Sequence, residues 1–245
     1  MNKGIVRKSL FVLLWLAIWQ VASILIHNDI LLAGPYEALL ALFRLGKTPD
    51  FWLSVLYTVL KISLGFGIGT LSGIVLASVS YRFKIFREFI SLPVLVIKSV
   101  PVASFVILVL IWAGAPSLSI VISALVVFPM IYLNVLSGLD STDRKMIEMS
   151  SLFSFRFTDK ARHIYLPSVA PHLKSAISVS AGMAFKSGIA AEVIGRPLRS
   201  IGSGLYSSKV ILATDELFAW TFCAVILAFL FEKVISYFLR RLLDP

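Results

Sequence analysis

Six long apolar stretches dominate this chain of 245 residues and decide what it can fold into. Hydrophobic residues make up 58% of the sequence and charged residues only 15%, which is more apolar surface than a water-soluble domain can bury. A helix needs on the order of 20 apolar residues to cross a bilayer. The sequence therefore predicts an all-α polytopic membrane protein with about six spans, at residues 9–26, 53–80, 92–112, 117–137, 173–194 and 217–239.

The basic residues orient these spans. The net charge of +10 comes from side chains scattered between the apolar stretches, which argues against a nucleic-acid-binding protein. Because cytoplasmic loops carry an excess of Lys and Arg, we expect both termini to be cytoplasmic. This places inside Lys3, Arg7, Lys8, Arg82, Lys84, Arg87, Arg144, Lys145, Arg156, Lys160, Arg162, Arg240 and Arg241, and outside Arg44, Lys47, Arg196, Arg199 and Lys209.

Two segments are then expected outside the membrane. Residues 36–45 form a short amphipathic pattern that we expect to lie on the surface. Residues 195–216 are interrupted by Pro197, Gly202 and Gly204, which indicates an ordered loop or a partly re-entrant segment. At the amino terminus, the first apolar run lacks a convincing cleavage site, so it is expected to be a retained span.

Residues 140–172 form the only long polar segment, between two hydrophobic halves. Asp140 and Asp143 suit the start of a helix, and apolar residues at helical spacing follow them, which predicts a short amphipathic helix. Thr158 is the predicted cap of a second short helix. Pro167 and Pro171 are expected to end or redirect that helix.

This loop resembles the cytoplasmic signature of permeases from binding-protein-dependent ABC importers, which reads Glu-Ala-Ala, three residues, Gly, nine residues, Ile, any residue, Leu-Pro. Five residues fall on this spacing without a gap: Glu148, Ser154, Ile164, Leu166 and Pro167. Met149 and Ser150 stand where the two alanines would be, and Ser154 stands where the glycine would be. The departure at Ser154 concerns the tightness of the turn and not the register.

The resemblance implies a type I (MetI-like) ABC importer permease, with one transmembrane domain over residues 1–245 in the inner or plasma membrane. Loop 140–172 would form coupling helices that dock on a separate ATPase. The expected partners are that ATPase, a second permease subunit, identical or different, an extracytoplasmic solute-binding protein and membrane lipid. ATP and Mg would bind the ATPase, and no cofactor is expected on this chain, which lacks a Gly-x-x-x-x-Gly-Lys-Ser/Thr loop. Phe155 and Phe157, with Phe153, could be apolar knobs that enter the ATPase groove or could pack beneath the loop.

Looser similarities point to one branch of these permeases. The Ala190-Ala191-Glu192 run before a Gly-rich segment, the region around Pro101 and the Ile-Trp-Ala-Gly-Ala run at 111–115 resemble the nitrate/sulfonate/taurine-type permeases. The implied substrate is a small anion or small organic solute, such as nitrate, a sulfonate, taurine, bicarbonate or a vitamin precursor.

Ionisable residues inside apolar spans are costly and need a reason. Lys61 is close enough to a span end to snorkel. Lys98 lies in the interrupted third span, between Pro93 and Pro101, and either faces the translocation path or snorkels. Lys186 and Glu192 are expected to border the path, although the lysines could instead neutralise Glu192 or a carboxylate on a partner.

Small residues recur every four positions along the second span, at Gly65, Gly69, Gly73 and Ala77. Such a stripe lets two helix backbones approach closely in lipid. We expect helix packing within the bundle. The alternatives are a direct role in the pore and a permease dimer interface.

Other function classes find little support. The histidines at 27, 163 and 172 are dispersed, and neither a His-Glu-x-x-His motif nor paired intramembrane aspartates occur, so no catalytic or metal site is predicted. Cys223 has no partner for an internal disulfide. The alternative is a self-contained secondary transporter or channel, which would use an ion gradient instead of an ATPase.

Overall fold

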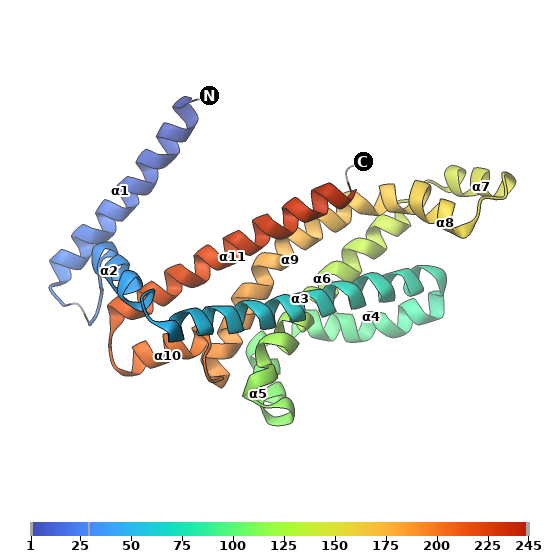
Figure 1. Cartoon of the computed structure of the whole chain (residues 1–245). Helices are drawn as coiled ribbons and strands as arrows, with labels where there is room; N and C mark the ends of the chain where they lie inside the picture. The colour runs from blue at the N-terminus through green and yellow to red at the C-terminus, as the bar shows by residue number, and fades with distance from the viewer. Residues whose placement is uncertain (1, 29, 244–245) are drawn as a thin grey trace.

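The structure is a computed structural model that describes residues 2–28 and 30–243, with the side chains of residues 2–6, 8–9, 240 and 242–243 outside this description. Lys3, Lys8 and Arg240 of the predicted cytoplasmic set are therefore not described. All regular elements in the described part are helices, as predicted (Figure 1). They are α1 Asn2–Ile26, α2 Pro35–Leu45, α3 Pro49–Arg82, α4 Lys84–Ser99, α5 Val102–Ala113, η1 Ala115–Ser117, α6 Leu118–Asp140, α7 Arg144–Leu152, α8 Phe157–Lys160, η2 Ala161–Tyr165, α9 Leu166–Gly195, α10 Ile201–Val210 and α11 Thr214–Leu243.

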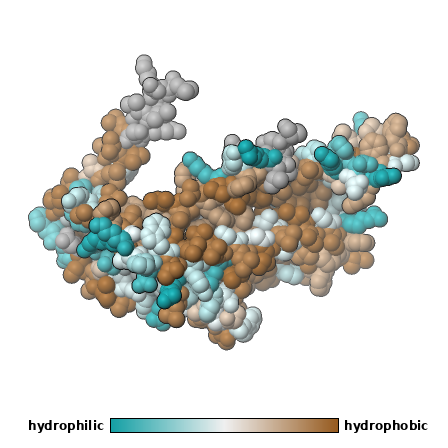
Figure 2. Space-filling view, viewed as in Figure 1, coloured by the Kyte–Doolittle hydropathy of each residue, from teal (hydrophilic) through white to brown (hydrophobic). Residues whose placement is uncertain are grey.

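The apolar helices match the predicted spans approximately. Four helical segments are long and apolar enough to cross a membrane: Pro49–Arg82, Ala115–Asp140, Phe157–Gly195 and Thr214–Leu239. The bent pair Lys84–Ser99 and Val102–Ala113 is together long and apolar enough for a broken span or a re-entrant loop, and Leu10–Ile26 is a shorter apolar helix. Figure 2 shows apolar side chains over most of the visible face of the bundle, as expected for a surface in contact with lipid.

The third predicted span, 92–112, is not one straight helix. It is divided between α4 and α5, which meet at 104°. Pro93 stays inside α4, and the break falls instead at Val100 and Pro101. Val100 is extended, because a residue before proline avoids the α-helical region, and Pro101 has no N–H with which to continue the helix.

Helix α3 packs against α6 along the stripe of small residues. A Cβ atom at Gly69 would lie 2.7 Å from the carbonyl oxygen of Ala124, and one at Gly73 would lie 2.9 Å from the Ile131 side chain. Gly65 faces the backbone of Ile120 in the same way. The stripe is therefore occupied by α6 of the same chain, which allows the two backbones to touch.

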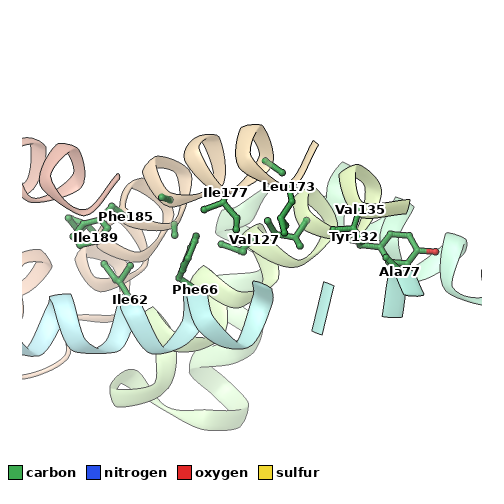
Figure 3. Close-up of a cluster of buried hydrophobic side chains, with 14 of the residues drawn as sticks. Ile62, Phe66, Ala77, Val127, Tyr132, Val135, Leu173, Ile177, Phe185 and Ile189 are labelled. Atoms are coloured by element: carbon green, nitrogen blue, oxygen red, sulfur yellow. The ribbon is translucent and has the colours of Figure 1, made fainter. Parts of the chain in front are cut away.

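The main core lies where α3, α6 and α9 meet (Figure 3). Phe66 and Phe185 both contact Phe231 on α11, with ring centroids 5.4 and 4.9 Å apart. Toward the far end of α6, the Tyr132 hydroxyl donates to Ser80 Oγ at 3.0 Å. These contacts hold α3, α6, α9 and α11 together as one bundle.

Four short helices lie at the two ends of this bundle, whereas α5 projects from its side (Figure 1). Helices α2 and α10 lie at one end, and α7 and α8 extend from the other. Helix α2 confirms the predicted amphipathic segment, and residues 195–216 contain α10 between two short connections. Helix α1 stands apart from the bundle, although Trp19 near its end packs on Phe218 and Phe222 of α11.

Candidate functional site

Helix α7 begins after Asp143, whose side chain accepts a hydrogen bond from the Lys145 backbone N–H at 2.9 Å. The predicted helix is therefore present and capped by the second of the two acids. Asp140 does not start it. It is the last residue of α6, and its carboxylate forms a two-bonded ion pair with Arg87 on α4, at 2.8 and 3.1 Å.

The turn after α7 has the backbone that the glycine of the signature favours. Ser154 has φ of 51°, in the left-handed region that costs most residues energy. The Phe155 N–H donates to the Ser150 carbonyl at 2.9 Å and closes the turn. Ser150 itself is fully buried, so the second alanine position of the signature holds a small residue for a packing reason. The tight turn is thus formed without glycine.

The second short helix differs from the prediction. Arg156, not Thr158, precedes its first residue, Phe157. Pro167 and Pro171 do not end it, because α8, η2 and α9 form one helical segment of 39 residues, Phe157–Gly195. Its π turn, Ala161–Tyr165, ends two residues before Pro167, and such a wider turn accommodates a residue that cannot donate a backbone hydrogen bond.

The signature residues divide into exposed and buried positions. Glu148, Ser154, Leu166 and Pro167 are exposed, and Ile164 is buried at the base of the loop. The loop also presents large apolar side chains to solvent at its tip: Leu152, Phe153 and Phe157 are 85%, 70% and 80% exposed, and Phe155 is 39% exposed. These four residues are called the apolar tip below. Figure 1 shows that α7 and α8 project beyond the bundle.

Glu192 lies at the opposite end of α9 and has no exposed surface. Its carboxylate accepts hydrogen bonds from three different elements: Thr58 Oγ1 of α3 at 2.9 Å, Ser119 Oγ of α6 at 2.7 Å and the Gly202 N–H of α10 at 3.1 Å. It therefore joins four helices from inside the subunit. The expectation that Glu192 itself borders an open path does not fit this burial.

Thr58 extends this network, and sequence reasoning did not select it. The same hydroxyl oxygen that donates to Glu192 accepts the Ile201 N–H at 3.0 Å, at the start of α10. A threonine in an apolar span gives no signal by itself, because a hydroxyl can bond to its own helix. The feature of the sequence that pointed to this network was Glu192, because a carboxylate inside an apolar span is energetically costly.

Lys186, about 1.7 turns before Glu192 on α9, faces a different direction. Its side chain is exposed and lines a cavity of about 420 Å³ between α9, α10 and α11, with Phe185 and Phe229. Glu232 of α11 lines the same cavity and accepts a hydrogen bond from Ser178 at 2.9 Å. Glu232 was not predicted, although an acid within an apolar span was a detectable signal. Lys186 and Glu192 thus do not share a surface.

Lys98 is exposed in the last turn of α4, just before the bend at Pro101. It does not line the cavity that contains Lys186. The three predicted path residues therefore occupy three separate environments in the single subunit.

Comparison with known proteins decides the family. Residues 69–245, more than half of the chain, match the family described as "Binding-protein-dependent transport system inner membrane component". The chain belongs to this family. It is a transport permease of the inner membrane with several membrane-crossing helices, and not an enzyme.

Individual relatives of this permease carry related names. It is 25% identical over 93% of its length, and 83% of the relative's, to the putative aliphatic sulfonates transport permease protein SsuC of Bacillus subtilis. It is 23% identical over 91% of its length, and 83% of the relative's, to the taurine transport system permease protein TauC of Escherichia coli. The formylaminopyrimidine transport permease protein ThiX of Halalkalibacterium halodurans is 21% identical over 84% of this chain and 82% of its own. These names support the predicted sulfonate/taurine-type branch.

Proposed function

We propose that this permease is one of two membrane subunits of an ATP-driven importer, and that residues 148–167 dock on a separate ATPase. The apolar tip is the observation that carries this proposal. Exposure of the Leu152, Phe153 and Phe157 side chains to water is energetically unfavourable. These residues lie on a structured loop that projects beyond the bundle. Exposed apolar side chains of this kind suit a groove on a partner protein.

The charge distribution supports a cytoplasmic position for this loop. The end that carries this loop includes eight basic residues: Arg82, Lys84, Arg87, Arg144, Lys145, Arg156, Lys160 and Arg162. The opposite end has five, Arg44, Lys47, Arg196, Arg199 and Lys209. Both termini would then be cytoplasmic. The ATPase would bring ATP and Mg to this side, and a solute-binding protein would deliver substrate at the end formed by α2 and α10.

The translocation path would contain a small anion or small organic solute. Lys186 is the side chain that best suits this role, because its ammonium lines a cavity within the membrane-crossing part of the bundle. Lys98 would line the path near the bend of the broken span. Glu192 would not contact the solute but would hold α10 against α3 and α6, behind the residues that line the path. The sulfonate and taurine relatives favour an organic sulfonate as the substrate class.

Affinity purification of the tagged full chain at native expression tests this function. We expect mass spectrometry to find an ATP-binding cassette subunit with the permease, and the purified complex to hydrolyse ATP. Phe157→Asp should remove the ATPase, because it puts a charge where an apolar side chain enters the groove. His163→Asp adds the same charge at an exposed position of the loop and should retain it.

Recovery of a folded wild-type oligomer without any ATPase would contradict the proposal. It would favour a self-contained transporter, whose uptake would follow an ion gradient. Loss of the ATPase from both variants would show that charge on the loop, and not the apolar tip, controls docking.

A further inference from the structure

A basic cavity of about 460 Å³ lies at the base of α7, apart from the apolar tip and the Lys186 cavity. Its charged lining comes from the end of α3, the start of α4, the end of α6 and the start of α7: Arg82, Lys84, Arg87, Asp140 and Arg144. Asp140 is paired with Arg87. Arg82, Lys84 and Arg144 form no ion pair within the described residues, so the cavity has three surplus positive charges.

Thr142 gives this cavity a polar group that lacks a partner. The residue is only 6% exposed and lines the cavity, and its hydroxyl has no hydrogen-bond partner in the structure. A buried hydroxyl without a partner is costly, so its presence beside unpaired cations indicates a ligand that accepts hydrogen bonds. A phosphate oxygen between Thr142 and the guanidinium groups would satisfy both requirements.

The position of the cavity indicates where that phosphate comes from. Arg82 is the last residue of a membrane-crossing helix, and Tyr81 and Tyr165, which line the cavity, pack edge to face with centroids 5.7 Å apart. Tyrosine is enriched at the depth of lipid headgroups. Phe83 and Ile85, on either side of Lys84, are exposed and offer apolar surface beside the cations. This combination suits an amphiphile better than a free anion.

We propose that this cavity binds the phosphate of an anionic phospholipid headgroup. The proposal rests on the proposed function only for the cytoplasmic side of the loop. Basic pockets between helices at that membrane face are known to suit anionic headgroups. The bound lipid would connect the start of α7, through Arg144, to the ends of α3 and α4, through Arg82 and Lys84. It would thereby hold the loop at residues 140–172 at a fixed position on the bundle.

Native mass spectrometry of the delipidated full-length permease tests this, with phosphatidylglycerol or phosphatidylcholine added. We expect saturable binding that prefers phosphatidylglycerol. Removal of two charges in the double variant Arg82→Gln, Arg144→Gln should weaken it by about 25-fold, at about fivefold per charge. Thr142→Val, which changes no charge, should also weaken phosphatidylglycerol binding. This variant tests the proposal even if the double variant does not fold. Lys209→Gln, which removes an exposed charge on α10, should leave phosphatidylglycerol binding unchanged.

Equal binding of both lipids, or unchanged phosphatidylglycerol binding in the double variant and in Thr142→Val, would overturn the proposal. If inorganic phosphate displaced the bound lipid as effectively as added phosphatidylglycerol does, the cavity would be a site for a free oxyanion instead. The measurement uses the permease alone, so failure of the ATPase purification would not affect its outcome.

Discussion

Thr58 on α3 donates a hydrogen bond to Glu192 on α9 at 2.9 Å, although the two residues are 134 positions apart in the chain. The contact is fully buried and includes the start of α10 through Ile201. A carboxylate in this position needs every donor it has, because an unsatisfied charged group inside a protein is very costly. This network therefore stabilises the end of the bundle opposite the loop at residues 140–172.

Thr58→Val should lower the free energy of unfolding by about 1–3 kcal/mol, because it removes a donor to Glu192 and leaves the Ile201 N–H unpaired. Thermal unfolding in detergent would measure this. Thr70→Val on the same helix is the matched control, since the Thr70 hydroxyl has no partner and its loss should be neutral or stabilising. Equal losses in the two variants would show that the network adds nothing.

Gly69→Ala should destabilise the subunit by about 1–3 kcal/mol, because the new methyl group would press on the backbone of Ala124. Gly67→Ala, two residues away, meets no atom within 4 Å and should be neutral or slightly stabilising. Unfolding of the monomeric chain in detergent separates this packing role from a dimer interface. If Gly69→Ala changed only the dimerisation of the permease, the stripe would act between subunits.

Ser154→Gly should stabilise the loop at residues 140–172 by about 1 kcal/mol, because glycine adopts the left-handed backbone of this turn without strain. Ser154→Val should do the opposite, since a branched side chain tolerates that backbone poorly. Limited proteolysis between α7 and α8, or hydrogen exchange of the Phe155 amide, reports the effect. Identical protection in both variants would contradict the role of the turn.

Lys186→Met should reduce uptake of an anionic solute by about tenfold, through loss of a charge-assisted contact inside the membrane. Lys233→Met on α11 is the control, because Lys233 lies over the Phe229 ring and does not line the cavity. Uptake into proteoliposomes with the complete transporter measures both. Unchanged uptake with Lys186→Met would leave this lysine with a structural role.

The sequence predicted elements whose signals are local. Apolar length identified four helices that can cross a membrane, although the first predicted span is a shorter apolar helix and the third is divided. Helical spacing identified α2 and α7, and the signature register placed Ser154 at the tight turn. Features that depend on distant parts of the chain were not visible: Thr58 joins Glu192 only because α3, α6, α9 and α10 meet. Proline gave mixed information. Pro101 breaks a helix, but Pro167 follows a π turn that accommodates it, and no residue pattern distinguished the two cases.

The helical segment Phe157–Gly195 joins the polar loop at residues 140–172 to the end where Glu192 holds α10. At 1.5 Å per residue, a rod of this length spans roughly 58 Å. If this segment turned as one body about the end near Glu192, a tilt of about 5° would carry the other end through roughly 5 Å. In the proposed importer, a displacement of this size would open or close a passage for a small solute.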